Sequence, residues 1–305
     1  MEKIIKIWTR DSKLAVYQAY FVKNQLEKIW YQAELVFIKS DWDKNRINPL
    51  YEMWIEWVFT RTLDIALLEE KIDIAVHSLK DVPTKMAKWI ILAWVPKRWE
   101  YKDILVYKWD YENIKNEVII WTSSLRRQSF WLNKYPHHKI ENLRWNIPKR
   151  LEKVKENSNW FWWIFAKVAL ERLEIKEKNF VDLDFMLPAP AQWAIWIACL
   201  TKNSQIKKIC EKLNDKNTEI CVWIERKFLN LLEWGCSMPI WTLAEIKENK
   251  IIFNWSFLSI DWKEKYDVQI IEDIKNYELV AKKAYEKLIE NPKAKELLKN
   301  FRLWK

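Results

Sequence analysis

Glycine is almost absent from this chain of 305 residues, in which it occurs once against 23 tryptophans. Average usage of about 7% would give roughly 21 glycines in a chain of this length. Many of the tryptophans stand where a turn favours glycine, as in Asp41-Trp42, Asn254-Trp255 and Asp261-Trp262, although a bulky side chain is an outlier at positive φ. We hypothesise that the gene encodes glycine with UGA and that this codon has been read as tryptophan; the alternative is a genuinely tryptophan-rich protein.

Three further absences limit the class of protein. No apolar run approaches the roughly 20 residues of a membrane helix, and the opening residues lack the pattern of a signal peptide. The four cysteines, Cys199, Cys210, Cys221 and Cys236, form no C-x-x-C pair, so neither a disulfide framework nor a metal site is indicated. We therefore expect a cytoplasmic protein without a membrane partner, in which at least one thiol serves chemistry.

The charge and size of the chain indicate a globular protein with an anionic partner. Hydrophobic residues make up 50% of the sequence and the formal net charge is +10, so the chain can bury a core and attract anions. Nucleic acid, phosphorylated metabolites and polycarboxylates all remain open at this point.

Strand-like and helical segments alternate through the first two thirds of the chain. Strand-like runs stand at 73–78, 90–95, 103–108, 117–122 and 194–200, and helical spacing between such runs predicts a largely parallel α/β sheet. We expect two α/β domains like those of periplasmic binding proteins, crossed twice by the chain, and a smaller C-terminal α+β domain. The expected domains are residues 1–96 with 194–213, then 97–193, then 214–305.

Polar clusters follow two of the N-terminal strands. Thr9-Arg10-Asp11-Ser12 begins a helix, and on its own this cluster is better explained by N-capping. The second cluster, His77 to Pro83, places Lys80 beside Asp81 after an apolar strand. A carboxylate beside a cation can stay ionised and stabilise a positive charge or move a proton, although in isolation this cluster is better explained by a solvated ion pair.

A third cluster combines hydroxyl groups with arginines. Thr122-Ser123-Ser124 precedes Arg126 and Arg127 at a predicted helix start, where backbone N–H groups bind anions and guanidinium groups hold carboxylates or phosphates. The next predicted strand-to-helix junctions carry Arg144, Arg150 and Arg172. Arginines at several strand ends favour a polyanionic ligand, rather than the single basic stripe with stacking aromatics that nucleic acid favours.

The fourth cluster places a cysteine in a turn. Cys236 lies within Glu233 to Pro239, directly after a predicted helix. Turn cysteines are more accessible than core cysteines, so an attachment or nucleophilic role is reasonable, although on its own this cysteine is better explained as a structural thiol.

Six segments taken together resemble the hydroxymethylbilane synthase (porphobilinogen deaminase) family. They are IWTRDSKLAVYQA, DIAVHSLKDVPT, WTSSLRRQ, LRWNIPKR, LPAPAQWAIWI and ERKFLNLLEWGCSMPIWTLAE. The segments resemble the family more closely when glycine is read at Trp121, Trp145, Trp193, Trp234 and Trp241. The resemblance implies an enzyme that joins four porphobilinogen molecules head to tail on a dipyrromethane cofactor, held by a thioether to Cys236. It also implies that Asp81 is the catalytic carboxylate.

The same resemblance implies which residues bind the cofactor, through the Cys236 thioether and through contacts to its pyrroles and carboxylates, and which bind the substrate. For the cofactor they are Cys236, Lys80, Asp81, Thr122, Ser123, Ser124, Arg126, Arg127 and Arg144; for the substrate they are Arg10, Ser12, Arg150, Arg172 and Gln192. We expect a monomer without nucleic acid or metal.

Two departures from the family pattern stand out. Glu56 replaces an expected lysine in the loop before Val58-Phe59, and Lys167 to Leu170 replaces a run of small residues. The alternative interpretation is a two-lobed binding protein for an organic polyanion, which needs neither Cys236 nor Asp81.

Overall fold

The computed structural model describes ten stretches of the chain. They are residues 4–9, 13–37, 65–82, 88–107, 114–142, 152, 161–172, 179–232, 240–259 and 261–303. For Lys13, Asp81, Phe161, Arg172 and 300–303, only the backbone is described.

The chain forms two compact units, each made of two sequence segments. Unit 1 comprises Met1–Arg98 and Ala191–Met238, and unit 2 comprises Trp99–Pro190 and Pro239–Lys305. Two of the crossings fall close to those predicted near 96 and 194. The three-domain division expected from the sequence stays a prediction.

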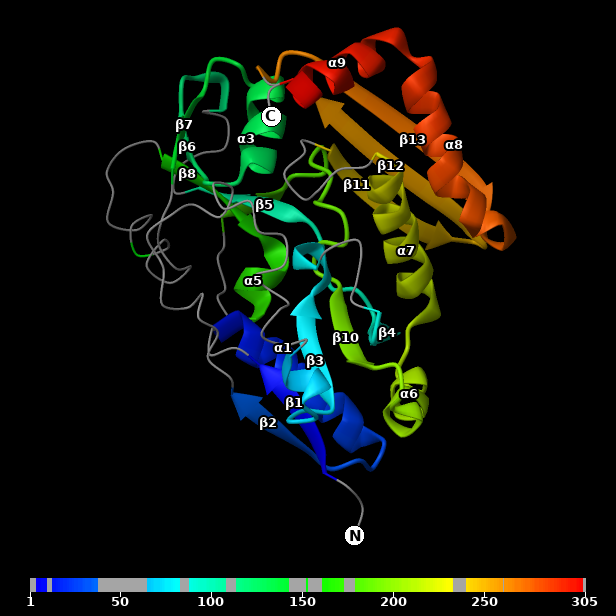
Figure 1. Ribbon diagram of the computed structural model, residues 1–305. Helices are drawn as coiled ribbons and strands as arrows, with labels where there is room; N and C mark the ends of the chain where they lie inside the picture. Colours follow the sequence, from blue (N-terminus) through cyan, green and yellow to red (C-terminus); the bar gives the residue numbers. More distant parts are fainter. Residues whose placement is uncertain are drawn as a thin grey trace. The chain divides into compact units, whose positions relative to one another are not determined.

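Unit 1 is built on a five-stranded sheet with the order β2-β1-β3-β10-β4. Its strands are β1 (Ile5–Thr9), β2 (Ala33–Phe37), β3 (Ile74–Ser78), β4 (Ile90–Trp94) and β10 (Ile195–Leu200). Its helices are α1 (Lys13–Lys28), α6 (Ser204–Glu211) and α7 (Lys216–Leu231) (Figure 1). α7 begins where the sequence supplies an N-cap, since the side chain of Asp215 accepts a hydrogen bond from the Thr218 N–H at 2.7 Å.

Unit 2 contains a second five-stranded sheet, with the order β7-β6-β8-β5-β9. Its strands are β5 (Asp103–Val106), β6 (Ile119–Trp121), β7 (Lys139–Glu141), β8 (Phe161–Ala166) and β9 (Phe180–Asp182), and its helices are α3 (Leu125–Lys134) and α5 (Lys167–Arg172). The described part of β8, from Trp162 to Ala166, is buried along its whole length, as expected for a central strand covered on both faces.

Both sheets are mixed, so the expectation of largely parallel sheets was wrong. In unit 1, β1 runs parallel to β2 and β3 while β10 is antiparallel to β3 and β4. In unit 2, β6 runs parallel to β7 and β8 while β5 is antiparallel to β8 and β9. The reversed strand is in each case the first one after a crossing between units, where no βαβ connection constrains its direction.

The rest of unit 2 is a three-stranded antiparallel sheet, β11-β12-β13, with two C-terminal helices (Figure 1). The bounds are β11 (Ile240–Lys247), β12 (Lys250–Leu258), β13 (Lys265–Asp273), α8 (Tyr277–Glu290) and α9 (Pro292–Leu303). In the sequence, the strand-like runs IIFNWSFLSI and KYDVQII, with the turn signal Asp261-Trp262 between them, predict β12 and β13 but not β11. The polar-faced pattern that follows predicts one long C-terminal helix, whereas the structure has two, and the second begins at Pro292, which lacks the N–H that would continue the first.

Each unit has its own buried core. In unit 1, Trp8, Ala75, Trp196 and Ala198 belong to one cluster of buried residues, and in unit 2 a separate cluster includes Ile120, Phe130 and Leu258. None of the described helices is long and apolar enough to cross a membrane.

Among the residues that the structure describes, three tryptophans adopt the left-handed backbone conformation. Trp30, Trp193 and Trp262 have φ of 69°, 61° and 60°. Trp30 follows α1, where its N–H donates to the Glu27 carbonyl and the Tyr31 N–H donates to the Leu26 carbonyl. This pair of bonds is the Schellman motif, whose left-handed residue is usually glycine.

Candidate functional site

The end of β3 presents the predicted catalytic turn in unit 1. β3 leads into a 3₁₀ turn, Leu79–Asp81, which carries Lys80 and Asp81. Leu79 and Val82 flank these two residues and are both 2% exposed, while Lys80 is exposed. The buried neighbours therefore anchor the turn while its charged residues follow the strand end, as the sequence predicted.

Backbone contacts fix the same turn. The Leu79 N–H donates to the Ala194 carbonyl at 2.9 Å, and Arg226 Nη1 on α7 donates to the carbonyls of Leu79 and Val82 at 3.3 and 3.0 Å. These bonds come from two other segments of unit 1, so the backbone of Asp81 lies in a braced turn.

A second set of predicted residues meets at the start of α3 in unit 2. Ser124 is the N-cap, and its Oγ accepts from the Arg127 N–H at 3.5 Å. Thr122 is buried, and its Oγ1 accepts from the Ser124 N–H at 3.2 Å, whereas Ser123 is exposed. The TSSLRR motif thus forms a helix start with hydroxyl groups beside it, which is chemistry suited to anions.

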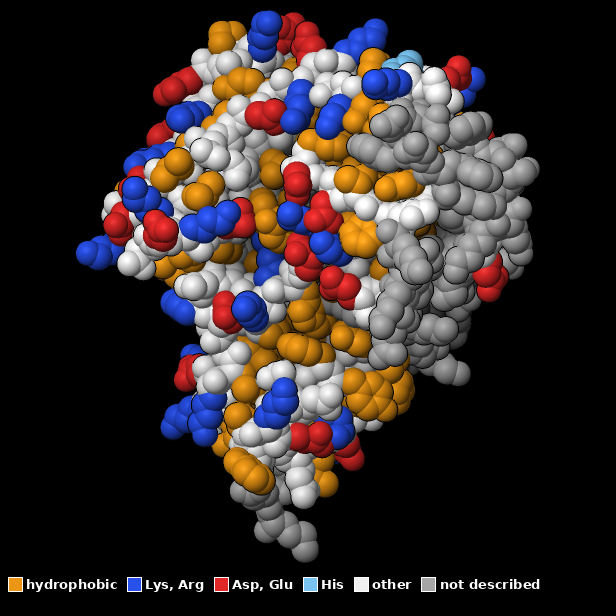
Figure 2. Space-filling view, turned by 180° about the vertical axis from the view of Figure 1, so that it is seen from behind, with side chains coloured by type: hydrophobic (Ala, Val, Ile, Leu, Met, Phe, Trp, Pro, Cys, Tyr) orange, Lys and Arg blue, Asp and Glu red, His pale blue; other side chains and the backbone are white. Residues whose placement is uncertain are grey.

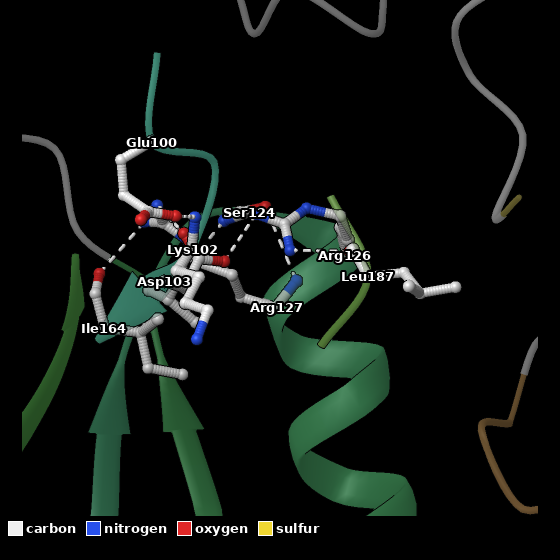
Figure 3. Close-up of polar contacts among 9 residues, drawn as sticks. Glu100, Lys102, Asp103, Ser124, Arg126, Arg127, Ile164 and Leu187 are labelled. Atoms are coloured by element: carbon white, nitrogen blue, oxygen red, sulfur yellow. Dashed lines mark hydrogen bonds and ion pairs between the residues drawn. The ribbon is translucent and has the colours of Figure 1, made fainter. Parts of the chain in front are cut away.

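Arg126 and Arg127 share one carboxylate. Asp103 at the start of β5 is 2% exposed; its Oδ2 accepts from Arg126 Nη2 at 2.5 Å and its Oδ1 from Arg127 Nη2 at 2.8 Å (Figure 3). Each guanidinium also donates to a carbonyl, Arg126 to Leu187 at 3.0 Å and Arg127 to Ile164 at 2.9 Å (Figure 3). Three groups from three segments, the Asp103 carboxylate and the carbonyls of Leu187 and Ile164, therefore hold the pair in place.

The electrostatics of this cluster leave a net positive charge. Burial opposes ionisation of Asp103, but Arg126 and Arg127 outweigh that effect and hold the pKa of its carboxyl below the usual range. Asp103 is therefore ionised at neutral pH, and one negative charge faces two positive ones. The residues present fit a ligand that carries carboxylates, such as the acetate and propionate groups of a dipyrromethane.

Gln192 lies in unit 1 beside a buried ion pair. Its carbonyl accepts from Arg98 Nε at 2.9 Å, and Arg98 Nη1 lies 2.6 Å from Glu225 Oε1. Glu225 is fully buried and its Oε2 also accepts from the Ala191 N–H at 2.5 Å. Arg98 and Ala191 are the residues at which the chain leaves and re-enters unit 1, so Glu225 ties both crossings to α7.

The described cysteines are poorly placed for attachment chemistry. Cys199, Cys210 and Cys221 are all buried. Burial raises the pKa of the Cys199 thiol to about 11 and that of Cys210 to about 12, so their reactive thiolate forms are scarce at neutral pH. Among the four cysteines of the sequence, Cys236 is the one to which this argument does not apply.

Several predicted site residues cannot be placed. Arg10, Ser12, Arg144, Arg150 and Cys236, together with Glu56, lie outside the described residues, and Asp81 and Arg172 are described by their backbone alone. The structure brings together Thr122, Ser124, Arg126 and Arg127 in unit 2. Leu79, which begins the Lys80 turn, is bonded to Ala194, two residues after Gln192, in unit 1.

Sequence reasoning missed Asp103, Arg226 and Glu225. A signal existed for Asp103, because an aspartate at the start of the apolar run DILV requires a cationic partner if the strand is buried. Glu225 and Arg226 stand next to each other in a helical pattern, where charged residues usually face solvent, so nothing local distinguished them.

Charge is mixed on the face of the protein that Figure 2 displays. Figure 2 shows lysine and arginine side chains interspersed with aspartate and glutamate on the face that it displays, without a single basic stripe. Among the described residues, no group of His, Cys, Asp and Glu could hold a metal ion.

Comparison with known proteins identifies the family. Residues 5–208 match the model "Porphobilinogen deaminase, dipyromethane cofactor binding domain", and residues 219–290 match "Porphobilinogen deaminase, C-terminal domain". The chain is 35% identical over 302 residues to porphobilinogen deaminase from a Nitratiruptor species, covering 96% of each chain. It is 38% identical over 248 residues to probable porphobilinogen deaminase from Methanocaldococcus jannaschii, covering 80% of this chain and 84% of the relative. The chain belongs to the porphobilinogen deaminase family.

Proposed function

We propose that this chain is a hydroxymethylbilane synthase, a transferase of tetrapyrrole biosynthesis that condenses four porphobilinogen molecules head to tail and releases a linear tetrapyrrole by hydrolysis. The family match over 5–208 and 219–290 supports this activity. Among the described residues, the main support for this activity is the pair Arg126 and Arg127 at the start of α3. The two guanidinium groups share one carboxylate, so a positive charge remains for a ligand that carries carboxylates. The same evidence favours the enzyme over a two-lobed binding protein.

The dipyrromethane cofactor is proposed to be attached to Cys236. When bound, this group supplies the primer on which the pyrrole chain is built. The matching domain is described by its binding of this cofactor, and the burial of Cys199, Cys210 and Cys221 leaves Cys236 as the best candidate thiol.

The carboxylates of the cofactor are proposed to be bound by charged and hydroxyl groups at strand ends. Arg126, Arg127, Thr122, Ser123 and Ser124 stand together at the start of α3. Lys80 and Arg144 complete the proposed cofactor set, and Arg10, Ser12, Arg150, Arg172 and Gln192 the proposed substrate set. Each porphobilinogen brings two carboxylates, so the growing pyrrole chain needs many cationic partners. The protein's net charge of +10 is consistent with that need.

Asp81 is proposed to be the catalytic carboxylate. Loss of ammonia from porphobilinogen leaves a cation, and a carboxylate fixed beside it lowers the barrier to its formation. The bonds from Arg226 and Ala194 to the turn suit this role, because electrostatic stabilisation depends on groups that do not have to reorganise.

Replacing Asp81 tests its role. Asp81→Asn keeps the size of the side chain and removes its charge, so we expect turnover of porphobilinogen to fall about 10²- to 10⁴-fold with folding retained. Glu69→Gln, an exposed carboxylate paired with Lys71, is the control and should turn over normally. Near-normal turnover of Asp81→Asn would contradict the assignment.

Replacing Cys236 tests the attachment point. Mass spectrometry of the denatured Cys236→Ser protein should show no covalently bound dipyrromethane, whereas the Cys221→Ser control should retain it. A bound dipyrromethane in Cys236→Ser would overturn this assignment. A monomeric, cytoplasmic enzyme is part of the same proposal, and light scattering of the purified protein tests its oligomeric state.

A further inference from the structure

Arg126 and Arg127 are consecutive residues of α3, yet their guanidinium groups converge on one carboxylate. Consecutive residues of an α-helix are about 100° apart around its axis, so their side chains leave α3 in different directions. In the structure, both guanidinium groups nevertheless reach the same carboxylate, one on each oxygen of Asp103 (Figure 3).

Asp103 itself has little freedom to move. It begins β5, whose pairing with Ala166 on β8 fixes its backbone, and its own carbonyl accepts from the Leu183 N–H at 2.9 Å. Its side chain is almost completely buried, so water competes little for its oxygens. The carboxylate is therefore a fixed point relative to which both guanidinium groups are placed.

We propose that Asp103 is a positioning residue for the cofactor site: it aligns Arg126 and Arg127 so that their remaining charge binds a carboxylate of the dipyrromethane. This proposal rests on the proposed function. It adds a residue that neither contacts the reacting atoms nor belongs to the predicted site, and that acts through the two arginines.

The competing explanation is that Asp103 only neutralises buried arginines. Both explanations predict that loss of Asp103 lowers stability, since breaking a buried pair leaves an uncompensated charge. They differ in cofactor content: a purely structural role leaves each folded molecule able to hold the dipyrromethane, while a positioning role does not.

Two variants separate charge from geometry. Asp103→Asn removes the negative charge and directs an amide N–H₂ toward one of the arginines. Asp103→Glu keeps the charge but moves it by one methylene. Asp182→Asn is the matched control. Asp182 lies on β9, which pairs with β5 in the same sheet, and its partly exposed carboxylate forms an ion pair with Lys167 at the start of α5.

The experiment has two readouts. The first is the fraction of folded protein that carries dipyrromethane, measured by intact-mass analysis after gel filtration. The second is the rate at which cofactor-free protein acquires dipyrromethane from porphobilinogen. We expect Asp103→Asn to acquire it at least tenfold more slowly than the unsubstituted protein, Asp103→Glu to be slowed as well, and Asp182→Asn to match the unsubstituted protein. Normal acquisition by either folded Asp103 variant overturns the proposal. So does failure of both to fold while Asp182→Asn folds, because that shows a structural requirement. If the unsubstituted folded protein acquires no dipyrromethane, the proposed function fails instead.

An independent observation concerns the tryptophans. Trp30, Trp193 and Trp262 occupy left-handed backbone positions that glycine adopts without steric cost. Trp8, Trp94, Trp163 and Trp196 are each at most 3% exposed, and their indole N–H groups have no hydrogen-bond partner among the described residues. Buried indole N–H groups usually find a partner.

Trp131 differs from this set. It is fully buried, and its Nε1 donates to His138 Nδ1 at 3.0 Å, while His138 Nε2 lies 3.0 Å from the Ile114 carbonyl. This tryptophan is part of a satisfied network within the core of unit 2.

We infer that the protein from its native source carries glycine at positions 8, 30, 94, 163, 193, 196 and 262. At position 131 it carries tryptophan. Peptide mass spectrometry of protein from the native source, together with the codons of the gene, tests this position by position. We expect UGA and a glycine residue mass at the first seven positions and UGG with tryptophan at 131. Tryptophan at 30, 193 or 262, or glycine at 131, would overturn the division.

Discussion

Replacing Trp30 by glycine should stabilise the protein. Trp30 is 88% exposed, so little apolar burial is lost with its indole, and its φ of 69° places it in the left-handed region. That conformation costs a residue with a Cβ about 1–2 kcal/mol, whereas the extra freedom of glycine in the unfolded chain costs about 0.4–1 kcal/mol. The difference favours Trp30→Gly by about 0.5–1 kcal/mol.

The assay is urea unfolding followed by far-UV circular dichroism, on two chains that differ at position 30 alone. With a slope of about 1–3 kcal/mol per molar urea, the midpoint should rise by roughly 0.2–1 M. Trp89→Gly is the matched control, because Trp89 is also exposed, at 65%, but is not among the residues with positive φ; its midpoint should fall. A midpoint that falls equally in both variants would refute the reasoning.

Three further predictions follow from titratable groups. Cys199 and Cys210 should resist iodoacetamide at pH 8 in the folded protein and react on unfolding, because burial raises their pKa values; fast native labelling would contradict their burial. Burial lowers the pKa of His138 in the folded protein, so its imidazole binds a proton more readily in the unfolded chain. The free energy of unfolding should therefore fall as the pH drops below about 6.5. His138→Gln should remove this pH dependence, whereas the same substitution at exposed His137 should leave it. The pKa of Asp103 is lowered, so its stabilising contribution should persist above about pH 3.9 and be lost below it; acid unfolding of Asp103→Asn should lack that step.

Much of the local structure could be predicted from the sequence because its signals are local. The apolar runs at 73–78, 90–95 and 194–200 became β3, β4 and β10, and the TSSLRR motif began a helix capped by Ser124. Turn chemistry also held, since Asp261-Trp262 joins β12 to β13 with a positive φ at Trp262. These features depend on side-chain pattern and capping, which are visible along the chain.

What could not be predicted depends on contacts distant in sequence. The reversed directions of β5 and β10 follow from chain crossings rather than from any residue within those strands. The bond from Asp103 to Arg126 spans 23 residues, and that from Arg226 to Val82 spans 144. The predicted site therefore contained the arginines but not the carboxylate that aligns them.

The proposed activity is tested most directly with the chain that carries glycine at the positions proposed to be encoded by UGA, incubated with porphobilinogen. We expect release of ammonia, formation of a linear tetrapyrrole, and a dipyrromethane that stays bound to the denatured protein and maps to the peptide containing Cys236. A folded chain that releases no ammonia and acquires no covalently bound pyrrole would contradict it.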